Sequence, residues 1–231
     1  MLGDRRIKIV GLGGIGSALC DNLCRFLNHQ PTRCRLVLID GDDYEIKNKA
    51  RQSFNQLGNK ARVKCTEMRL SHENISFDDV AEYLTPSNIG EYIQEDDVVF
   101  LCVDNHKTRK VVSDHAKTLE NVIVISGGNE YTDGNVQIFI REGGENKTPS
   151  LSDYHPEIAH PGDKSPDEMS CEELANSEPQ LLFANLSVAT IMCWTFYNIL
   201  EGKLAQNSSE VYFDMLKMNT LAKQRKPRAQ K

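Results

Sequence analysis

The sequence lacks the features that mark zinc proteins, secreted proteins and nucleic-acid-binding proteins. Its seven cysteines are odd in number and show none of the paired CxxC spacings of a structural zinc site. The N-terminus is charged and leads into a short apolar stretch, so it does not have the form of a signal peptide. The formal net charge is −6, which disfavours binding to nucleic acid. We therefore expect no zinc, no nucleic-acid partner and a cytoplasmic location.

Long apolar runs are also scarce, and residues 181–200 form the one stretch of about the length that crosses a bilayer. Polar side chains interrupt it at Asn185, Ser187, Thr190, Thr195 and Asn198. Such groups are costly in hydrocarbon, so a membrane span is the less favoured alternative. We predict a helix that is buried against a sheet, and no membrane partner.

What the sequence does contain is the alternation of apolar strands and helices that is typical of an α/β domain. Its 231 residues are 39% hydrophobic and 26% charged, which suits one globular domain with a substantial core. We predict a single domain over residues 1–231, with a Rossmann-like, doubly wound, mainly parallel sheet and additional antiparallel strands near the C-terminus. Strands are expected near residues 6–10, 35–40, 75–77, 98–103, 122–126, 135–141 and 211–213, the last at an edge of the sheet. Helices are expected near residues 15–27, 58–68, 106–119 and 179–200, with a short one after Pro86 capped by Ser87.

A glycine-rich turn follows the first strand. The apolar residues 7–10 lead into GLGGIG, in which Gly11, Gly13, Gly14 and Gly16 precede a predicted helix. Gly11 permits a tight turn, Gly13 lets the backbone approach a phosphate, and Gly16 lets helix and strand pack closely. The free N–H groups at the helix start would then face an anion. The motif predicts a nucleotide site, against the alternative of a glycine turn without a ligand.

A second group of polar residues favours a nucleoside triphosphate over a nicotinamide or flavin cofactor. The second strand ends at Asp40, about twenty residues beyond the glycines, where an acid can bind ribose hydroxyls. It is followed by Asp42, Asn48, Arg51 and Lys60. A dehydrogenase needs one acid here, whereas triphosphates need cations and their metal needs carboxylates.

A third group follows the continuous apolar run at residues 98–103, which predicts a central parallel strand buried on both faces. This strand delivers Asp104 at its carboxyl end, where open α/β sheets bind their ligands. An alternative is that Asp104 caps the helix that starts near residue 106.

Taken in order, these motifs resemble those of the ThiF/MoeB-type adenylyltransferases, which are relatives of the ubiquitin-activating enzymes. The family pattern GxGGxGS is met by residues 11–17, and DxDxVxxxNLxRQ is met by Asp40, Asp42, Asn48, Arg51 and Gln52. A lysine in a later turn is met by Lys60, and DNxxxR is met by Asp104, Asn105 and Arg109. The resemblance covers most of residues 5–141.

The resemblance implies ATP-dependent adenylation of a carboxylate, typically the C-terminal glycine of a ubiquitin-like or sulfur-carrier protein that ends in Gly-Gly. It also implies a homodimer. In this family-based assignment, Asp40 would hold the ribose, and Gly13 and Gly14 would admit the nucleotide. Arg51 and Lys60 would stabilise the charge on the departing phosphates.

The same resemblance assigns roles to the remaining polar residues. Asp104 would bind Mg²⁺, which screens the phosphates from the incoming carboxylate, and Asn48 would orient a phosphate or the metal. Asn105 is also included in the nucleotide site. Asp42 either acts directly or caps its loop, and Arg109 is expected to make a structural ion pair or to contact the substrate tail.

Residues 142–178 shift in composition toward Pro, Gly, Ser and acidic residues, and we predict a loop. In the resembled family, this region crosses over the active site. It contains Cys171, a candidate nucleophile that could take the acyl group, although the two glutamates beside it disfavour a thiolate. An incidental cysteine is the alternative, and a metal site that joins His155 and His160 to Cys171 is a further one.

The C-terminal segment, residues 217–231, carries six basic residues and no acid. We predict a disordered tail, with docking of an acidic partner as the alternative.

Other functions compete with adenylation of a carrier protein. The same fold could adenylate a small-molecule or tRNA-linked carboxylate, as the threonylcarbamoyl-adenosine dehydratases do. A non-catalytic partner subunit is disfavoured by the intact set of Asp40, Arg51, Lys60 and Asp104. A nicotinamide-dependent oxidoreductase would leave Arg51 and Lys60 unexplained.

Overall fold

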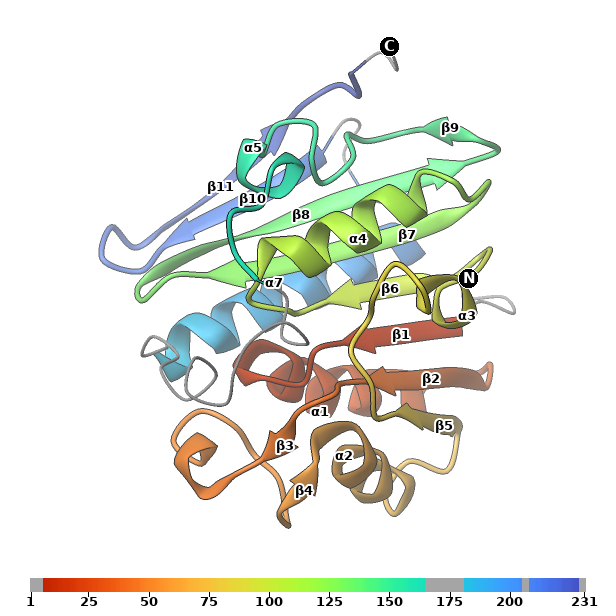
Figure 1. Ribbon diagram of the computed structural model, residues 1–231, viewed down its shortest axis with the longest axis vertical. Helices are drawn as coiled ribbons and strands as arrows, with labels where there is room; N and C mark the ends of the chain where they lie inside the picture. The colour runs from red at the N-terminus through yellow and green to blue at the C-terminus, as the bar shows by residue number, and fades with distance from the viewer. Residues whose placement is uncertain (1–5, 165–180, 205–207, 229–231) are drawn as a thin grey trace.

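A nine-stranded sheet forms the centre of the computed structural model, which describes residues 6–164, 181–204 and 208–228 (Figure 1). In spatial order, its strands are β11 (Asn219–Gln224), β10 (Ser208–Asp214), β8 (Asp133–Glu142), β7 (Val122–Asn129), β6 (Val98–Leu101), β1 (Arg6–Val10), β2 (Cys34–Ile39) and β5 (Ile75–Val80), with β9 (Glu145–Asn146) paired to β8. The strands from β7 to β5 are parallel, and β8, β10 and β11 pair antiparallel. The predicted fold class is confirmed.

Helices cover both faces of this sheet. One face carries α1 (Gly14–Asn28), α2 (Lys60–Arg69) and α7 (Leu182–Leu200), and the other carries α3 (Ile89–Tyr92), α4 (His106–Ala116) and α5 (Pro156–Ala159) (Figure 1). A two-stranded ladder of β3 (Asp43–Tyr44) and β4 (Gly58–Asn59) and the 3-10 turn η1 (Ile46–Asn48) lie between β2 and α2 along the chain. The domain is therefore doubly wound, with one core on each face.

The alternation of side chains along the central strands produces these two cores. In β1, Ile7 and Ile9 join the core under α1 and α7, while Val10 joins the core under α4. In β6, Phe100 joins the core under α1 and α7, and Leu101 joins the core under α4. Because neighbouring residues of a strand point to opposite faces, a strand covered on both sides is mainly apolar.

By length and composition alone, α7 could cross a membrane. It packs against β7, β8 and α1, and it buries Val188, Met192 and Phe196 on that side. Its other side is open, since Phe183 is 61% exposed and Trp194 is 54% exposed. The predicted helix against the sheet is confirmed, but it is buried along one side only.

The starts of two helices differ from the prediction. α2 begins at Lys60 rather than at residue 58, because β4 pairs with β3 before the helix begins. The N-cap of α3 is Asn88 and not Ser87, whose hydroxyl is bonded to the hydroxyl of Thr85 instead. Strand pairing sets the first boundary, and in the second the hydroxyl of Ser87 is engaged outside the helix.

The prediction of a disordered C-terminal tail is wrong for residues 219–224, which form β11. This strand takes the edge position predicted for residues 211–213, and β10 lies inside the sheet between β8 and β11. Across the β10–β11 ladder, the ammonium of Lys223 lies 4.1 Å from the ring centroid of Tyr212. β11 is mostly exposed and has no apolar alternation. Its strand conformation therefore depends on pairing with β10 rather than on burial of side chains.

Candidate active site

The carboxyl ends of β1, β2 and β6 meet at one edge of the sheet. β1 lies between the other two, and the chain proceeds from β1 to β2 and β5 on one side before it returns to β6 and β7 on the other. Such a reversal of strand order is where open α/β sheets bind ligands. The glycine turn, Asp40 and Asp104 follow these three strands, so the fold brings the three sequence motifs to one place.

Two positions of the turn need glycine for geometric reasons. Gly11 has a φ of 86°, and a Cβ there would lie 3.0 Å from the backbone of Cys102. A Cβ on Gly16 would lie 1.9 Å from the carbonyl oxygen of Gly11. The structure therefore agrees with a tight turn at Gly11 and close packing at Gly16.

Gly14 has a packing role in addition to the one predicted for it. A Cβ on Gly14 would lie 2.1 Å from Nδ2 of Asn185, a residue of α7. Asn185 is fully buried, and neither polar atom of its amide has a hydrogen-bond partner within the described part of the chain. Gly14 thus makes room for α7. In the sequence, Asn185 is only a polar interruption of an apolar stretch, and no local signal predicts this contact with Gly14.

The N-terminus of α1 has the character of an anion site. The N-cap of α1 is Gly13, which offers no side chain to the N–H groups of the first turn. Unpaired N–H groups and the helix dipole attract negative charge. A Cβ on Gly13 would meet only Nε2 of Gln52, at 4.0 Å, so this glycine leaves space for a phosphate.

Asp40 connects the turn after β1 to the turn after β2. Its Oδ2 accepts a hydrogen bond from the N–H of Leu12 at 2.5 Å, and its Oδ1 accepts one from the N–H of Asp42 at 2.8 Å. Burial raises the pKa of the Asp40 carboxyl to about 6, although the nearby Lys60 opposes this shift. Each carboxylate oxygen keeps a lone pair that could accept a ribose hydroxyl.

Lys60 is a buried cation of this site. Its Nζ lies 2.7 Å from Oδ2 of Asp42, and the residue is 6% exposed. Burial alone would lower the pKa of Lys60, but the charges of Asp40, Asp42 and Asp104 raise it above the ordinary value. Lys60 is therefore held as an ammonium among three carboxylates.

Asp42 has a third role, beyond the two predicted for it. Tyr83 donates a hydrogen bond to Oδ1 of Asp42, and Lys60 donates one to Oδ2. Burial alone would raise the pKa of Asp42, but the charge of Lys60 and these two hydrogen bonds lower it. Asp42 thus anchors Lys60. Tyr83 stands 41 residues from Asp42 in the chain, so no local sequence signal marked it as a site residue.

Hydrogen bonds dock the start of α2 onto the loop after β2. The N–H of Lys60 donates to the carbonyl of Asp42 at 2.9 Å. Nδ2 of Asn59 donates to the carbonyls of Asp40 and Asp42 at 2.9 and 3.1 Å. Oδ1 of Asn59 accepts the N–H of Arg62 and so caps α2. This docking explains why Lys60 lies beside Asp40.

The loop between β3 and β4 carries Asn48, Arg51 and Gln52. Asn48 is buried, and its Oδ1 accepts the N–H of Glu45 at 3.0 Å, so its side chain shapes the loop. The N–H groups of Arg51 and Gln52 both donate to the Asn48 carbonyl at 3.0 Å. The side chain of Gln52 is buried next to Gly13. The loop thus places Gln52 at the glycine turn and leaves Arg51 partly exposed nearby.

The loop after β6 exposes Asp104. Asn105 caps α4, because its Oδ1 accepts the N–H of Thr108 at 2.7 Å. The alternative that Asp104 caps this helix is therefore wrong. The charge of Asp104 raises the pKa of Lys60, which puts this carboxylate within electrostatic reach of the ammonium.

Arg109 is a structural residue, and its contacts within the described part of the chain are hydrogen bonds rather than the predicted ion pair. Its buried guanidinium donates to Oγ of Ser126 at 2.8 Å and to the carbonyls of Val103 and Gly127 at 2.6 and 2.8 Å. A Cβ on Gly128 would lie 2.7 Å from this guanidinium. Arg109 therefore joins α4 to the end of β7.

The site residues suit Mg²⁺ better than a metal ion whose ligands all come from the protein. Within residues 6–164, 181–204 and 208–228, no group of three or more His, Cys, Asp or Glu side chains could hold a metal ion. Mg²⁺ takes one or two carboxylates and completes its shell with phosphate oxygens and water. The exposed Asp104 can supply such a carboxylate.

The candidate nucleophile Cys171 lies outside the described residues. The ring of His155 is bonded to Glu157 through Nδ1 at 2.7 Å and to Glu210 through Nε2 at 2.9 Å. Burial alone would lower the pKa of His155, but these two contacts raise it. Both ring nitrogens are thus engaged, which argues against the metal site predicted with His160 and Cys171.

Comparisons with known proteins agree with this architecture. The sequence profile of the ThiF family matches residues 1–231. Two similar proteins are the adenylyltransferase and sulfurtransferase MOCS3-1 of Zea mays, 31% identical over 150 residues, and MOCS3 of Sus scrofa, 31% identical over 147 residues. Each alignment covers 62% of this chain, with 30% of the maize protein and 31% of the pig protein. This chain thus spans about a third of the length of these relatives.

Solved structures share the fold. E. coli MccB in complex with MccA-N7isoASN superposes with a TM-score of 0.76 at 16% identity, covering 98% of this chain and 66% of that one. PaaA superposes with a TM-score of 0.72 at 17% identity, covering 96% of this chain and 73% of that one. At these identities the likeness concerns the fold.

Proposed function

Because this chain belongs to the ThiF family, we propose that it uses ATP to adenylate a carboxylate. The carboxylate attacks the α-phosphorus of ATP, an acyl adenylate forms, and pyrophosphate leaves. This reaction depends on positioning and on stabilising phosphate charge more than on covalent help from the protein.

The placement of Lys60 is the observation that supports this proposal most. Lys60 is the first residue of α2, where the helix dipole disfavours a cation. Three carboxylates nevertheless keep it charged, and the fold brings it to the sheet edge that carries the N-terminus of α1. A buried ammonium beside a phosphate-binding turn suits the charge that develops on a departing pyrophosphate.

The other site residues divide the remaining tasks. Asp40 accepts the ribose hydroxyls, the N–H groups after Gly13 contact a phosphate, and Arg51 adds positive charge from its loop. Asp104 holds Mg²⁺, which when bound screens the phosphates from the approaching carboxylate.

We propose the C-terminal glycine of a ubiquitin-like or sulfur-carrier protein as the source of the carboxylate. The names of the maize and pig relatives, adenylyltransferase and sulfurtransferase, support this choice over a small-molecule or tRNA-linked carboxylate. A later transfer of the acyl group to Cys171 belongs to the same proposal, as does a cytoplasmic location.

The test is ATP–pyrophosphate exchange by the full chain with a carrier protein that ends in Gly-Gly. Exchange should require the carrier and Mg²⁺, and Lys60→Ala should lower it about 100-fold because the phosphates lose a preorganised cation. The matched control is Lys47→Ala, which removes an exposed lysine paired with Glu45 on the neighbouring η1. Exchange at the wild-type rate in Lys60→Ala would overturn the role of Lys60 in stabilising the phosphates.

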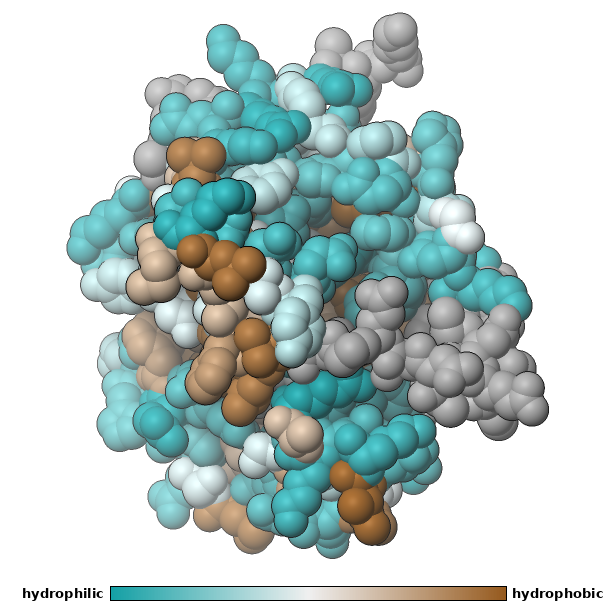
Figure 2. Space-filling view, turned by 90° about the vertical axis from the view of Figure 1, so that its left-hand side faces the viewer, coloured by the Kyte–Doolittle hydropathy of each residue, from teal (hydrophilic) through white to brown (hydrophobic). Residues whose placement is uncertain are grey.

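We also propose that a second copy of the chain covers the open side of α7. This helix has no charged residue over its 19 positions, and Phe183, Leu186, Trp194 and Tyr197 form an exposed stripe along it. Figure 2 shows apolar side chains on the side of the molecule where α7 starts and the β10–β11 hairpin turns. An uncharged stripe is self-complementary, since two copies bring no like charges together.

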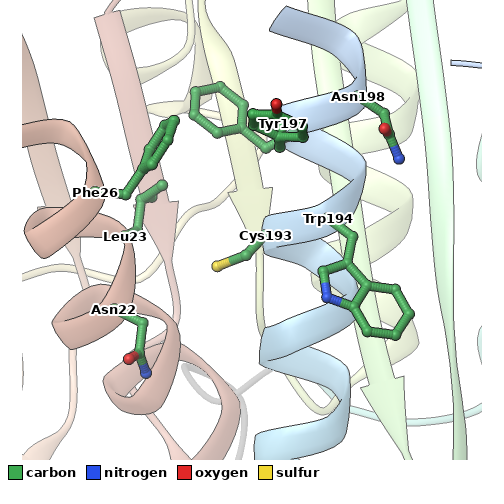
Figure 3. A pocket seen from close by; sticks show the side chains of 8 residues that line it. Asn22, Leu23, Phe26, Cys193, Trp194, Tyr197 and Asn198 are labelled. Atoms are coloured by element: carbon green, nitrogen blue, oxygen red, sulfur yellow. The ribbon is translucent and has the colours of Figure 1, made fainter. Parts of the chain in front are cut away.

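A groove of about 460 Å³ between α1 and α7 extends this surface. Leu23 and Phe26 line it from α1, and Cys193 and Tyr197 line it from α7 (Figure 3). The groove lies on the helical face rather than at the carboxyl ends of the strands. We therefore assign it to the contact between copies and not to the nucleotide.

A further inference from the structure

Tyr83 lies beside the candidate site, after the carboxyl end of β5. β5 pairs in parallel with β2, which sets Val80 beside Ile39, and the N–H of Asp40 donates to the carbonyl of Val80 at 3.0 Å. The segment after β5 is thereby held against the loop after β2.

Tyr83 has two separable contacts with that loop. Its ring packs on Gly41, where a Cβ would lie 2.8 Å from the ring atoms, and its hydroxyl donates to Oδ1 of Asp42. Removing the hydroxyl alone would therefore leave the ring contact in place.

The hydroxyl contact matters because Asp42 is not fixed by packing. The side chain of Asp42 is 38% exposed, whereas that of Lys60 is 8% exposed. Asp42 is held at both oxygens, by Tyr83 on Oδ1 and by Lys60 on Oδ2 at 2.7 Å. The hydrogen bond from Tyr83 thus keeps the carboxylate in the orientation that meets the ammonium.

We propose that Tyr83 is a positioning residue for adenylation: it holds Asp42, and Asp42 holds the ammonium of Lys60 at the phosphate-binding edge. This inference rests on the proposed function, in which Lys60 stabilises the phosphates. An ammonium has three donors, so Lys60 can keep Asp42 and contact a phosphate at once. If the ammonium is displaced, adenylation slows, because a preorganised charge stabilises the phosphates only from the correct position.

Tyr83 contributes no proton to the reaction in this scheme. Burial and the hydrogen bond to Asp42 raise the pKa of its hydroxyl, so it remains a donor at neutral pH. Because it acts on the phosphates only through Asp42 and Lys60, its effect should disappear when Lys60 is removed.

The variant Tyr83→Phe tests this inference. We expect the kcat of ATP–pyrophosphate exchange to fall about three- to tenfold, the size associated with one hydrogen bond, while the KM for ATP changes less than about twofold. The melting temperature should fall by no more than about 6 °C, because one hydrogen bond is lost and the ring contact remains. The matched control is Tyr92→Phe, since the hydroxyl of Tyr92 donates to Glu82 at 3.1 Å, away from Lys60, and its removal should change neither kinetic parameter.

A double-variant cycle separates this role from a general effect on the fold. In a Lys60→Ala background, adding Tyr83→Phe should change the remaining exchange rate less than about twofold. A further three- to tenfold loss in that background would overturn the path through Lys60.

A second readout does not depend on activity. Labelling of Lys60 by acetic anhydride, followed by mass spectrometry of its peptide, should be several-fold faster in Tyr83→Phe than in the wild type, because a looser ion pair frees the amine. If exchange is present and both labelling and kcat are unchanged in Tyr83→Phe, the inference fails while the proposed function stands. If labelling quickens but the wild type shows no exchange, the hold of Tyr83 on Lys60 through Asp42 stands, and its role in adenylation fails together with the proposed function.

Discussion

At the scale of single residues, the site combines a carboxyl group that resists ionisation with an ammonium that resists neutralisation. Asp40 is buried, and burial raises its pKa to about 6. Lys60 is also buried, yet neighbouring carboxylates raise its pKa rather than lower it. The two groups therefore differ in how they respond to pH, and Asp40 is the one that titrates near neutrality.

This difference predicts a pH dependence of nucleoside binding. Below pH about 6, Asp40 takes up a proton and becomes a poorer acceptor for ribose hydroxyls, so the affinity for adenosine should fall about tenfold between pH 7 and pH 5. Adenosine is the suitable ligand because it has no phosphate that titrates in this range. Calorimetric titration measures the affinity.

The control for this titration is 2′,3′-dideoxyadenosine, which lacks the 2′- and 3′-hydroxyls that would donate hydrogen bonds to Asp40. Its weaker affinity should not change with pH over the same range. Equal pH dependence of the two nucleosides would show that Asp40 does not bind the ribose.

At the scale of secondary-structure elements, α1 and α7 meet at the glycine turn through one close contact. Gly14 has no side chain, and the amide of Asn185 occupies the space that a Cβ would need. Gly14→Ala should therefore lower the free energy of unfolding by about 1–3 kcal/mol, the usual cost of overpacking. Asn185→Ala should restore most of that loss in the double variant, as measured by urea denaturation.

Gly162→Ala is the control, because a Cβ on Gly162 would meet no atom within 4 Å. This variant should leave the free energy of unfolding within about 0.5 kcal/mol of the wild type. If the double variant Gly14→Ala/Asn185→Ala were as unstable as Gly14→Ala alone, the contact would not be the cause.

The elements that carry the site could be predicted because each has a local signal. An apolar run that leads into glycines predicts a strand and a turn, and the run before Asp104 predicts a buried strand. Tyr83 has no such signal, because its role exists only once β5 lies beside β2. β11 was missed for a related reason, since its residues are exposed and it is held by pairing with β10.

At the scale of the whole molecule, the exposed apolar stripe on α7 is the proposed contact between two copies of the chain. The chain has a mass of 26.0 kDa, and we expect a particle of twice that mass by light scattering. Trp194→Glu should yield the single-chain mass, because a buried charge without a partner disfavours the contact. Trp194 is 54% exposed, so the fold of one chain should tolerate this change.

Leu70→Glu provides the matched control for the dimer, since Leu70 is 83% exposed but follows α2 rather than α7. This variant should keep the doubled mass. A wild-type chain that runs at 26.0 kDa, or a Trp194→Glu variant that stays dimeric, would contradict the assignment of this surface.

The claim that this chain forms an acyl adenylate is tested most directly by ATP labelled on its α-phosphorus. The full chain is incubated with this ATP, Mg²⁺ and a carrier protein that ends in Gly-Gly, and the acid-quenched carrier is assayed for label. We predict that the carrier is labelled by α-labelled ATP, is not labelled by γ-labelled ATP, and loses the label on addition of pyrophosphate. A carrier labelled from the γ-phosphate, or no labelled carboxylate despite measurable ATP binding, would contradict adenylation by this chain.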